Sequence, residues 1–218
     1  MTRLILVTLA ICLGFGGWAR ADDRGDCRDA SAWPDKVIVG CTSIIEAGRE
    51  SPEDLATSLV NRGDAYRKKA EHERAIADYE RAIALKPDYA EAYNGRGNSY
   101  RWKGQDDEAI ADFDKAIELK PNYAEAYNNR GVTYSGKDDY DRAIGDYTKA
   151  IELKPDYADA YGNRGNAYRG KRVADKAIAD FDKAVELTPD DTGIRGDRDN
   201  FYEQIGYERV IAAYARLI

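Results

Sequence analysis

Apolar and small residues recur at helical spacing in the middle of the chain. Three of them stand at positions i, i+4 and i+7, on one face of a helix, and three more repeat this spacing further on. The six positions are Tyr93, Gly97, Tyr100, Ala109, Phe113 and Ala116. A polar stretch at 104–106 separates the two sets, and Pro121 ends the second. The pattern predicts two helices joined by a turn.

This helix pair recurs with a period of 34 residues. A Lys-Pro-Asp/Asn-Tyr motif begins at Lys86, Lys120 and Lys154, and a weaker copy begins at Thr188. The period divides the centre of the chain into four units: 56–89, 90–123, 124–157 and 158–191. Self-similarity of this length predicts stacked units, each of which buries its apolar face only against its neighbours.

The four units resemble the tetratricopeptide repeat in their aromatic, Gly, Tyr, Ala, aromatic, Ala and Pro positions. In the third unit these are Tyr127, Gly131, Tyr134, Ala143, Tyr147, Ala150 and Pro155. The resemblance implies an all-α fold, an α-solenoid of stacked antiparallel helix pairs wound into a right-handed superhelix. The flanks read as degenerate repeats, so we expect an N-terminal cap at 22–55 and capping helices at 192–218.

The first 21 residues have the pattern of a signal peptide. Arg3 precedes an uncharged stretch at 4–15, which is short for a membrane span, and Ala19-Arg20-Ala21 forms a cleavage motif. Alternatives are an uncleaved anchor or a lipoprotein modified at Cys12, although Ile11 stands where a small residue is expected. We expect an exported protein, periplasmic or secreted, that begins at Asp22 and is not stably inserted in the membrane after cleavage.

Cleavage leaves two cysteines, Cys27 and Cys41. Two thiols in an oxidising compartment usually pair, so we expect a structural disulfide that stabilises the N-terminal cap. The alternative is a redox-active pair, but Cys-x-x-Cys spacing is absent.

An arginine precedes the glycine in every unit, where the family usually has an apolar residue. A charge inside the helix pair needs a partner, and an aspartate precedes the aromatic residue of each second helix. We therefore expect an ion pair in each repeat: Arg62 with Asp78, Arg96 with Asp112, Arg130 with Asp146, and Arg164 with Asp180. The alternative is an anion-binding row of arginines, which the aspartates would neutralise.

Asparagines and further arginines recur on the first helix of each unit. The resemblance implies that these helices line a concave face. Because a side-chain amide offers both a donor and an acceptor, a row of asparagines suits the backbone of an extended peptide. The expected ligand residues are Asn61, Asn94, Asn98, Asn128, Asn129, Asn163, Asn166, Arg67, Arg101 and Arg169. The alternative is that the asparagines only tie neighbouring helices together.

Composition narrows the function further. The formal charge of −7 disfavours broad binding to nucleic acid or anionic membranes. His72 is the only histidine and lies in an expected turn, and the segments outside the repeats are too short for a catalytic domain. We expect no enzyme activity, no metal and no cofactor. The leading function is an adaptor that binds a peptide or protein segment, and the alternative is a homo-oligomer that associates end to end through its terminal helices.

Overall fold

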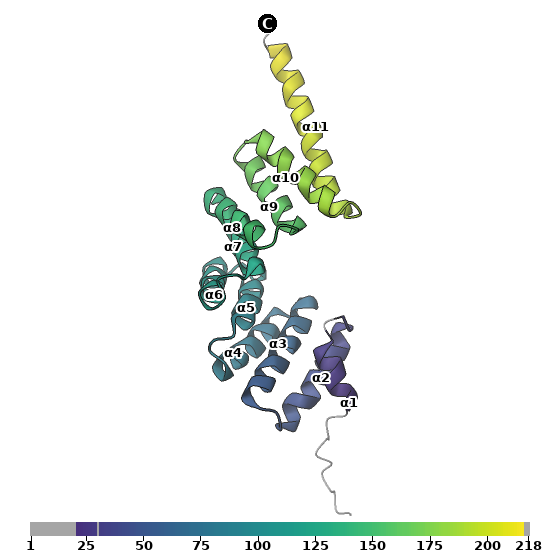
Figure 1. Ribbon diagram of the computed structural model, residues 1–218, viewed down its shortest axis with the longest axis vertical. Helices are drawn as coiled ribbons and strands as arrows, with labels where there is room; N and C mark the ends of the chain where they lie inside the picture. The colour runs from purple at the N-terminus through teal and green to yellow at the C-terminus, as the bar shows by residue number, and fades with distance from the viewer. Residues whose placement is uncertain (1–20, 30, 216–218) are drawn as a thin grey trace, which may run out of the picture.

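The protein is a row of antiparallel helix pairs stacked in chain order, as the computed structural model in Figure 1 shows. The structure describes residues 21–29 and 31–215, and the expected signal peptide lies almost wholly outside them. The described part contains eleven helices and no strand, which confirms the all-α solenoid. Their bounds are α1 Ala21–Arg28, α2 Pro34–Ala47, α3 Pro52–Lys68, α4 His72–Leu85, α5 Ala90–Trp102, α6 Asp106–Leu119, α7 Ala124–Gly136, α8 Tyr140–Leu153, α9 Ala158–Gly170, α10 Ala174–Leu187 and α11 Thr192–Ala215.

Each repeat closes around one buried aromatic ring. Tyr79, Phe113, Tyr147 and Phe181 come from the second helix and are almost fully buried. In the third repeat, a Cβ added to Gly131 on the first helix would lie 2.8 Å from the ring of Tyr147. Glycine is therefore needed at this position because the ring packs directly on the backbone of the facing helix.

The turn within each repeat reverses the chain at a residue with positive φ. The four equivalent positions are Ala70, Gly104, Asp138 and Arg172, with φ between 58° and 73°. Only the second repeat uses glycine, which adopts this conformation without the steric cost that other residues bear. The turn predicted near residues 104–106 is present.

The disulfide between Cys27 and Cys41 joins α1 to α2. Both cysteines are buried in a small cluster with Val37, Ile44 and Ala65, so α1 and α2 pack as a cap on α3. Because the sulfur atoms lie inside this packed cluster, the geometry favours the structural role over the redox alternative.

The C-terminal segment differs from the expected capping helices. Residues 192–215 form one continuous helix, α11, which extends away from the stack in Figure 1. Phe201 of α11 is buried against Phe181, with ring centroids 5.6 Å apart. No proline interrupts the segment, and Gly206 stands within the helix. None of the helices in the described residues has the length and apolar character of a membrane span.

Candidate functional site

The first helices of the repeats line a groove of about 820 Å³. It extends from α3 across α5 to α7, and the tyrosines that precede α5, α7 and α9 complete its wall. The lining residues are Val60, Asn61, Asp64, Arg67, Tyr89, Glu91, Asn94, Gly95, Asn98, Arg101, Trp102, Tyr123, Glu125, Asn129 and Tyr157. Six of the ten residues predicted to bind ligand therefore line one surface.

Several asparagine side chains in the predicted row join neighbouring helices. Asn129 Nδ2 donates to Asn94 Oδ1, and Asn163 Nδ2 donates to Asn128 Oδ1, each at 3.0 Å. Asn61 Nδ2 donates to the backbone oxygen of Cys27 at 3.0 Å. These amides hold one repeat to the next, which was the alternative interpretation of the row.

Asn128 does not lie on the groove. It is 6% exposed, and its side-chain oxygen is used by Asn163. Its predicted role as a ligand contact is corrected to a tie between α7 and α9. Adjacent polar residues on a helix point about 100° apart, so Asn129 lines the groove while Asn128 faces the next repeat.

The last three predicted ligand residues lie beyond this groove. Asn163 belongs to the tie with α7, and Asn166 Nδ2 lies 3.5 Å from Asp197 Oδ2 on α11. Arg169 lines a separate pocket of about 430 Å³ together with Phe201, Gln204 and Ile205 of α11. Because α11 packs on this end of the stack, the groove is confined to the first three repeats, the last of which ends with Tyr157.

Three groove asparagines, Asn61, Asn98 and Asn129, keep unused hydrogen-bonding capacity within the described residues. Asn98 Nδ2 donates to the Asn94 backbone oxygen at 3.1 Å, and Asn129 Nδ2 donates to Asn94 Oδ1. A side-chain amide has two N–H donors and one acceptor oxygen. Within the described residues, Asn98 and Asn129 each use one donor and leave the other donor and the oxygen available, as a peptide unit requires.

Tyrosines at repeat spacing form part of the wall, and sequence reasoning did not assign them to it. Tyr89, Tyr123 and Tyr157 come from the Lys-Pro-Asp/Asn-Tyr motif, so its period of 34 residues was the available signal. Tyr123 Oη accepts a hydrogen bond from Asn94 Nδ2 at 3.3 Å. Burial raises the pKa of Tyr157 to about 12, so this phenol stays protonated and can donate at neutral pH.

The groove acids are balanced by lysines of the following loops. Glu91 Oε1 lies 2.8 Å from Lys120 Nζ, and Glu125 Oε1 lies 3.8 Å from Lys154 Nζ. Asp64 accepts a hydrogen bond from Tyr79 Oη at 2.7 Å. The groove therefore combines neutral amides and phenols with acids that are each paired, which suits a ligand held mainly by hydrogen bonds.

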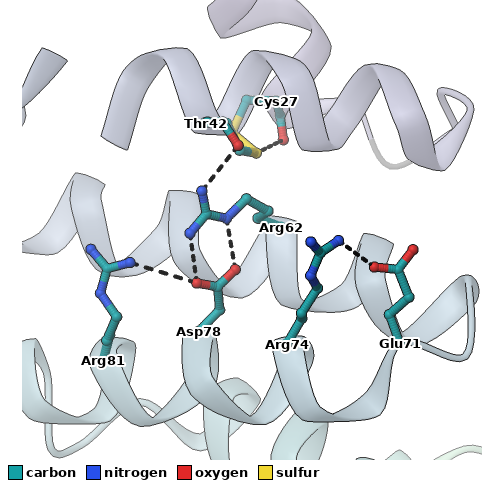
Figure 2. Close-up of polar contacts among 8 residues, drawn as sticks. Cys27, Thr42, Arg62, Glu71, Arg74, Asp78 and Arg81 are labelled. Atoms are coloured by element: carbon teal, nitrogen blue, oxygen red, sulfur yellow. Dashed lines mark hydrogen bonds and ion pairs between the residues drawn. A yellow bond between two sulfur atoms is a disulfide. The ribbon is translucent and has the colours of Figure 1, made fainter. Parts of the chain in front are cut away.

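The structure places the four predicted Arg–Asp pairs inside the repeats. In each pair Nε contacts Oδ2 and Nη2 contacts Oδ1, at 2.6 to 2.8 Å. Figure 2 shows the first pair, Arg62 with Asp78, and the hydrogen bond from Arg62 Nη1 to Thr42 on α2. Arg130 and Arg164 make the same kind of contact with the previous repeat, through Asp114 and Thr148.

Three helices therefore meet at the guanidinium in three of the four repeats. In all four repeats, the hydrogen bonds with the aspartate raise the pKa of the arginine, because they stabilise its charged form. The arginines lie in structural pairs rather than in a row open to anions.

His72 begins α4 and stacks on the exposed ring of Trp102, with ring centroids 6.1 Å apart. This agrees with its expected position at the turn. No cluster of metal-binding side chains occurs among the described residues.

Models described as TPR repeat match residues 63–101 and 97–138, and models described as tetratricopeptide repeat match 124–157 and 158–191. No curated protein sequence gave a match.

Solved structures with the same fold include a MamA protein, 30% identical, with a TM-score of 0.60 over 71% of this chain and 88% of that one. A thermophilic TPR protein of Thermus thermophilus is 20% identical, with a TM-score of 0.66 over 78% of this chain and 90% of that one. YrrB, described as a TPR protein with an unusual peptide-binding site, is 20% identical, with a TM-score of 0.60 over 84% of this chain and all of that one. The family models and the helix geometry agree, and this chain belongs to the tetratricopeptide repeat family.

Proposed function

We propose that the protein is an adaptor whose groove on α3, α5 and α7 binds an extended segment of a partner protein. The observation that carries the proposal is the available donor and acceptor on both Asn98 and Asn129, which line the same groove. An extended backbone presents one N–H and one C=O per residue and makes such contacts with little dependence on its side chains.

The groove also suits an extended chain because it crosses three repeats. Stacked helix pairs create extended concave binding surfaces. The tyrosines along one wall provide flat apolar area with polar tips, a combination common at protein interfaces.

The proposal is tested with peptides selected from a random 12-residue displayed library. Asn98→Trp places a large side chain in the groove, and Glu118→Trp places the same side chain on the exposed outer face of α6. We expect selected peptides to lose at least tenfold in affinity on Asn98→Trp, about 1.4 kcal/mol or more, and to bind Glu118→Trp unchanged.

Circular dichroism provides the control that both variants are folded. Equal affinity of the selected peptides for wild type and a folded Asn98→Trp protein would place their binding outside the groove and overturn the proposal.

We further propose that the adaptor acts outside the cytoplasm. Two features support this: the signal-peptide pattern of residues 1–21 and the buried disulfide, since disulfides persist in oxidising compartments. Intact-mass measurement of the protein from its native host should give a chain that begins at Asp22. A mature protein that retains residues 1–21 would contradict this prediction.

A further inference from the structure

One cation in the groove has no carboxylate partner. Among the charged lining residues, Asp64 pairs with Arg67, and the two glutamates pair with lysines of the following loops. Within the described residues, Arg101 makes no ion pair, and its guanidinium carbon lies 5.3 Å from the ring centroid of Trp102. The groove thus contains one guanidinium that the described part of the protein leaves unpaired.

Arg101 is also partly removed from water. Its Nε is buried and has no hydrogen-bond partner among the described residues. Burial lowers the pKa of Arg101, in contrast to the paired arginines of the repeats, whose pKa is raised. A buried donor without an acceptor is costly, and a carboxylate satisfies a guanidinium better than a neutral acceptor because it accepts two parallel hydrogen bonds.

The surroundings of Arg101 favour a single negative charge on the ligand. Asp64, Glu91 and Glu125 line the same groove and already have cationic partners, so among the described residues only the charge of Arg101 is left to balance. One carboxylate balances it, whereas a doubly charged phosphate would leave an excess negative charge beside these acids. Trp102 is 64% exposed beside Arg101; its ring stacks on His72, and its remaining exposed surface is open to a neighbouring ligand residue.

We propose that the groove selects extended segments that place a carboxylate on the Arg101 guanidinium, beside the ring of Trp102. This inference rests on the proposed binding of an extended segment and adds the chemistry that makes it selective. Backbone contacts at Asn98 and Asn129 would then hold the segment in general, while Arg101 would decide which segments bind well. The carboxylate is an Asp or Glu side chain or the C-terminus of the ligand.

The test uses synthetic 12-residue peptides that have lost binding to Asn98→Trp and are therefore groove-dependent. For each peptide, a set of variants is made in which one Asp or Glu at a time is changed to Asn or Gln. A further pair of variants has a free or an amidated C-terminus. We expect one of these neutralisations to lower affinity for the wild type at least tenfold and affinity for Arg101→Gln less than twofold. The position that responds identifies the source of the carboxylate.

Two further variants control the test. Arg101→Lys keeps the charge but not the paired donors, so its affinity should fall between those of wild type and Arg101→Gln. Arg81→Gln removes an exposed arginine of α4 outside the groove and should behave as wild type.

The outcomes separate this inference from the proposed function. Groove-dependent peptides whose affinity responds to no neutralisation, or responds equally in wild type and Arg101→Gln, would overturn the role of Arg101 and leave groove binding in place. Selected peptides that bind Asn98→Trp as tightly as wild type would overturn the proposed function and this inference with it.

Discussion

Replacing Arg130 with leucine should lower the free energy of unfolding by about 3–5 kcal/mol, because it leaves the carboxylate of Asp146 buried without its partner. The side chains of Arg130 and Asp146 are only 19% and 10% exposed, and two hydrogen bonds join them. The double variant Arg130→Leu with Asp146→Leu removes both charges and should recover much of the loss. Urea unfolding of the wild type, both single variants and the double variant measures the coupling.

An exposed pair in the same repeat provides the matched control. Arg142 and Asp139 form an ion pair at the start of α8, with Arg142 63% exposed. A double-mutant cycle on this pair should give a coupling of about 0.5 kcal/mol or less. Equal coupling in the two cycles, or none between Arg130 and Asp146, would mean that the internal pairs do not act as structural units.

Replacing Cys27 and Cys41 together with serine should destabilise the N-terminal cap by about 3 kcal/mol. The residues are 14 positions apart, and closing a loop of about 15 residues restricts the unfolded chain by roughly this free energy. Affinity for a groove-dependent peptide should change less than about twofold, because Asn98 and Arg101 lie on α5, beyond α2 and α3. Thermal unfolding and peptide titration of the same variant measure the two effects.

Thiol titration provides an independent check on the cap. The native protein should show no reactive thiol at Cys27 or Cys41. Two reactive thiols, or a double serine variant as stable as the wild type, would contradict the structural role of the disulfide.

The sequence predicted the repeats closely because every unit packs the same kinds of side chain in the same arrangement. A buried ring against a glycine needs fixed spacing, so the 34-residue period located α4 to α10 to within a few residues. The start of α3 was missed by four residues. Ser51 caps this helix by accepting a hydrogen bond from Asp54 N at 3.1 Å, and Pro52 follows it. The Ser-Pro start was visible in the sequence but lies outside the period.

The groove was predicted only in part, because its surface depends on how the repeats are rotated against one another. Asn128 and Asn129 point about 100° apart on α7, but only the stacking of α9 shows that the first is covered and the second lies on the groove. Asn166 and Arg169 repeat the positions of Asn98 and Arg101, yet α11 packs beside them. That Arg101 has no ion-pair partner among the described residues could be recognised only from the distances between helices, and the sequence of a single repeat does not contain these distances.

Chemical-shift mapping of the side-chain amides tests the central claim most directly. A groove-dependent peptide is titrated into the 15N-labelled protein, and the NH₂ resonances of Asn98, Asn129 and Asn128 are followed. An extended segment in the groove should shift the resonances of Asn98 and Asn129 and leave that of the buried Asn128 nearly unchanged. Shifts confined to α11 or to the outer helices, with Asn98 and Asn129 unaffected, would contradict binding in the groove.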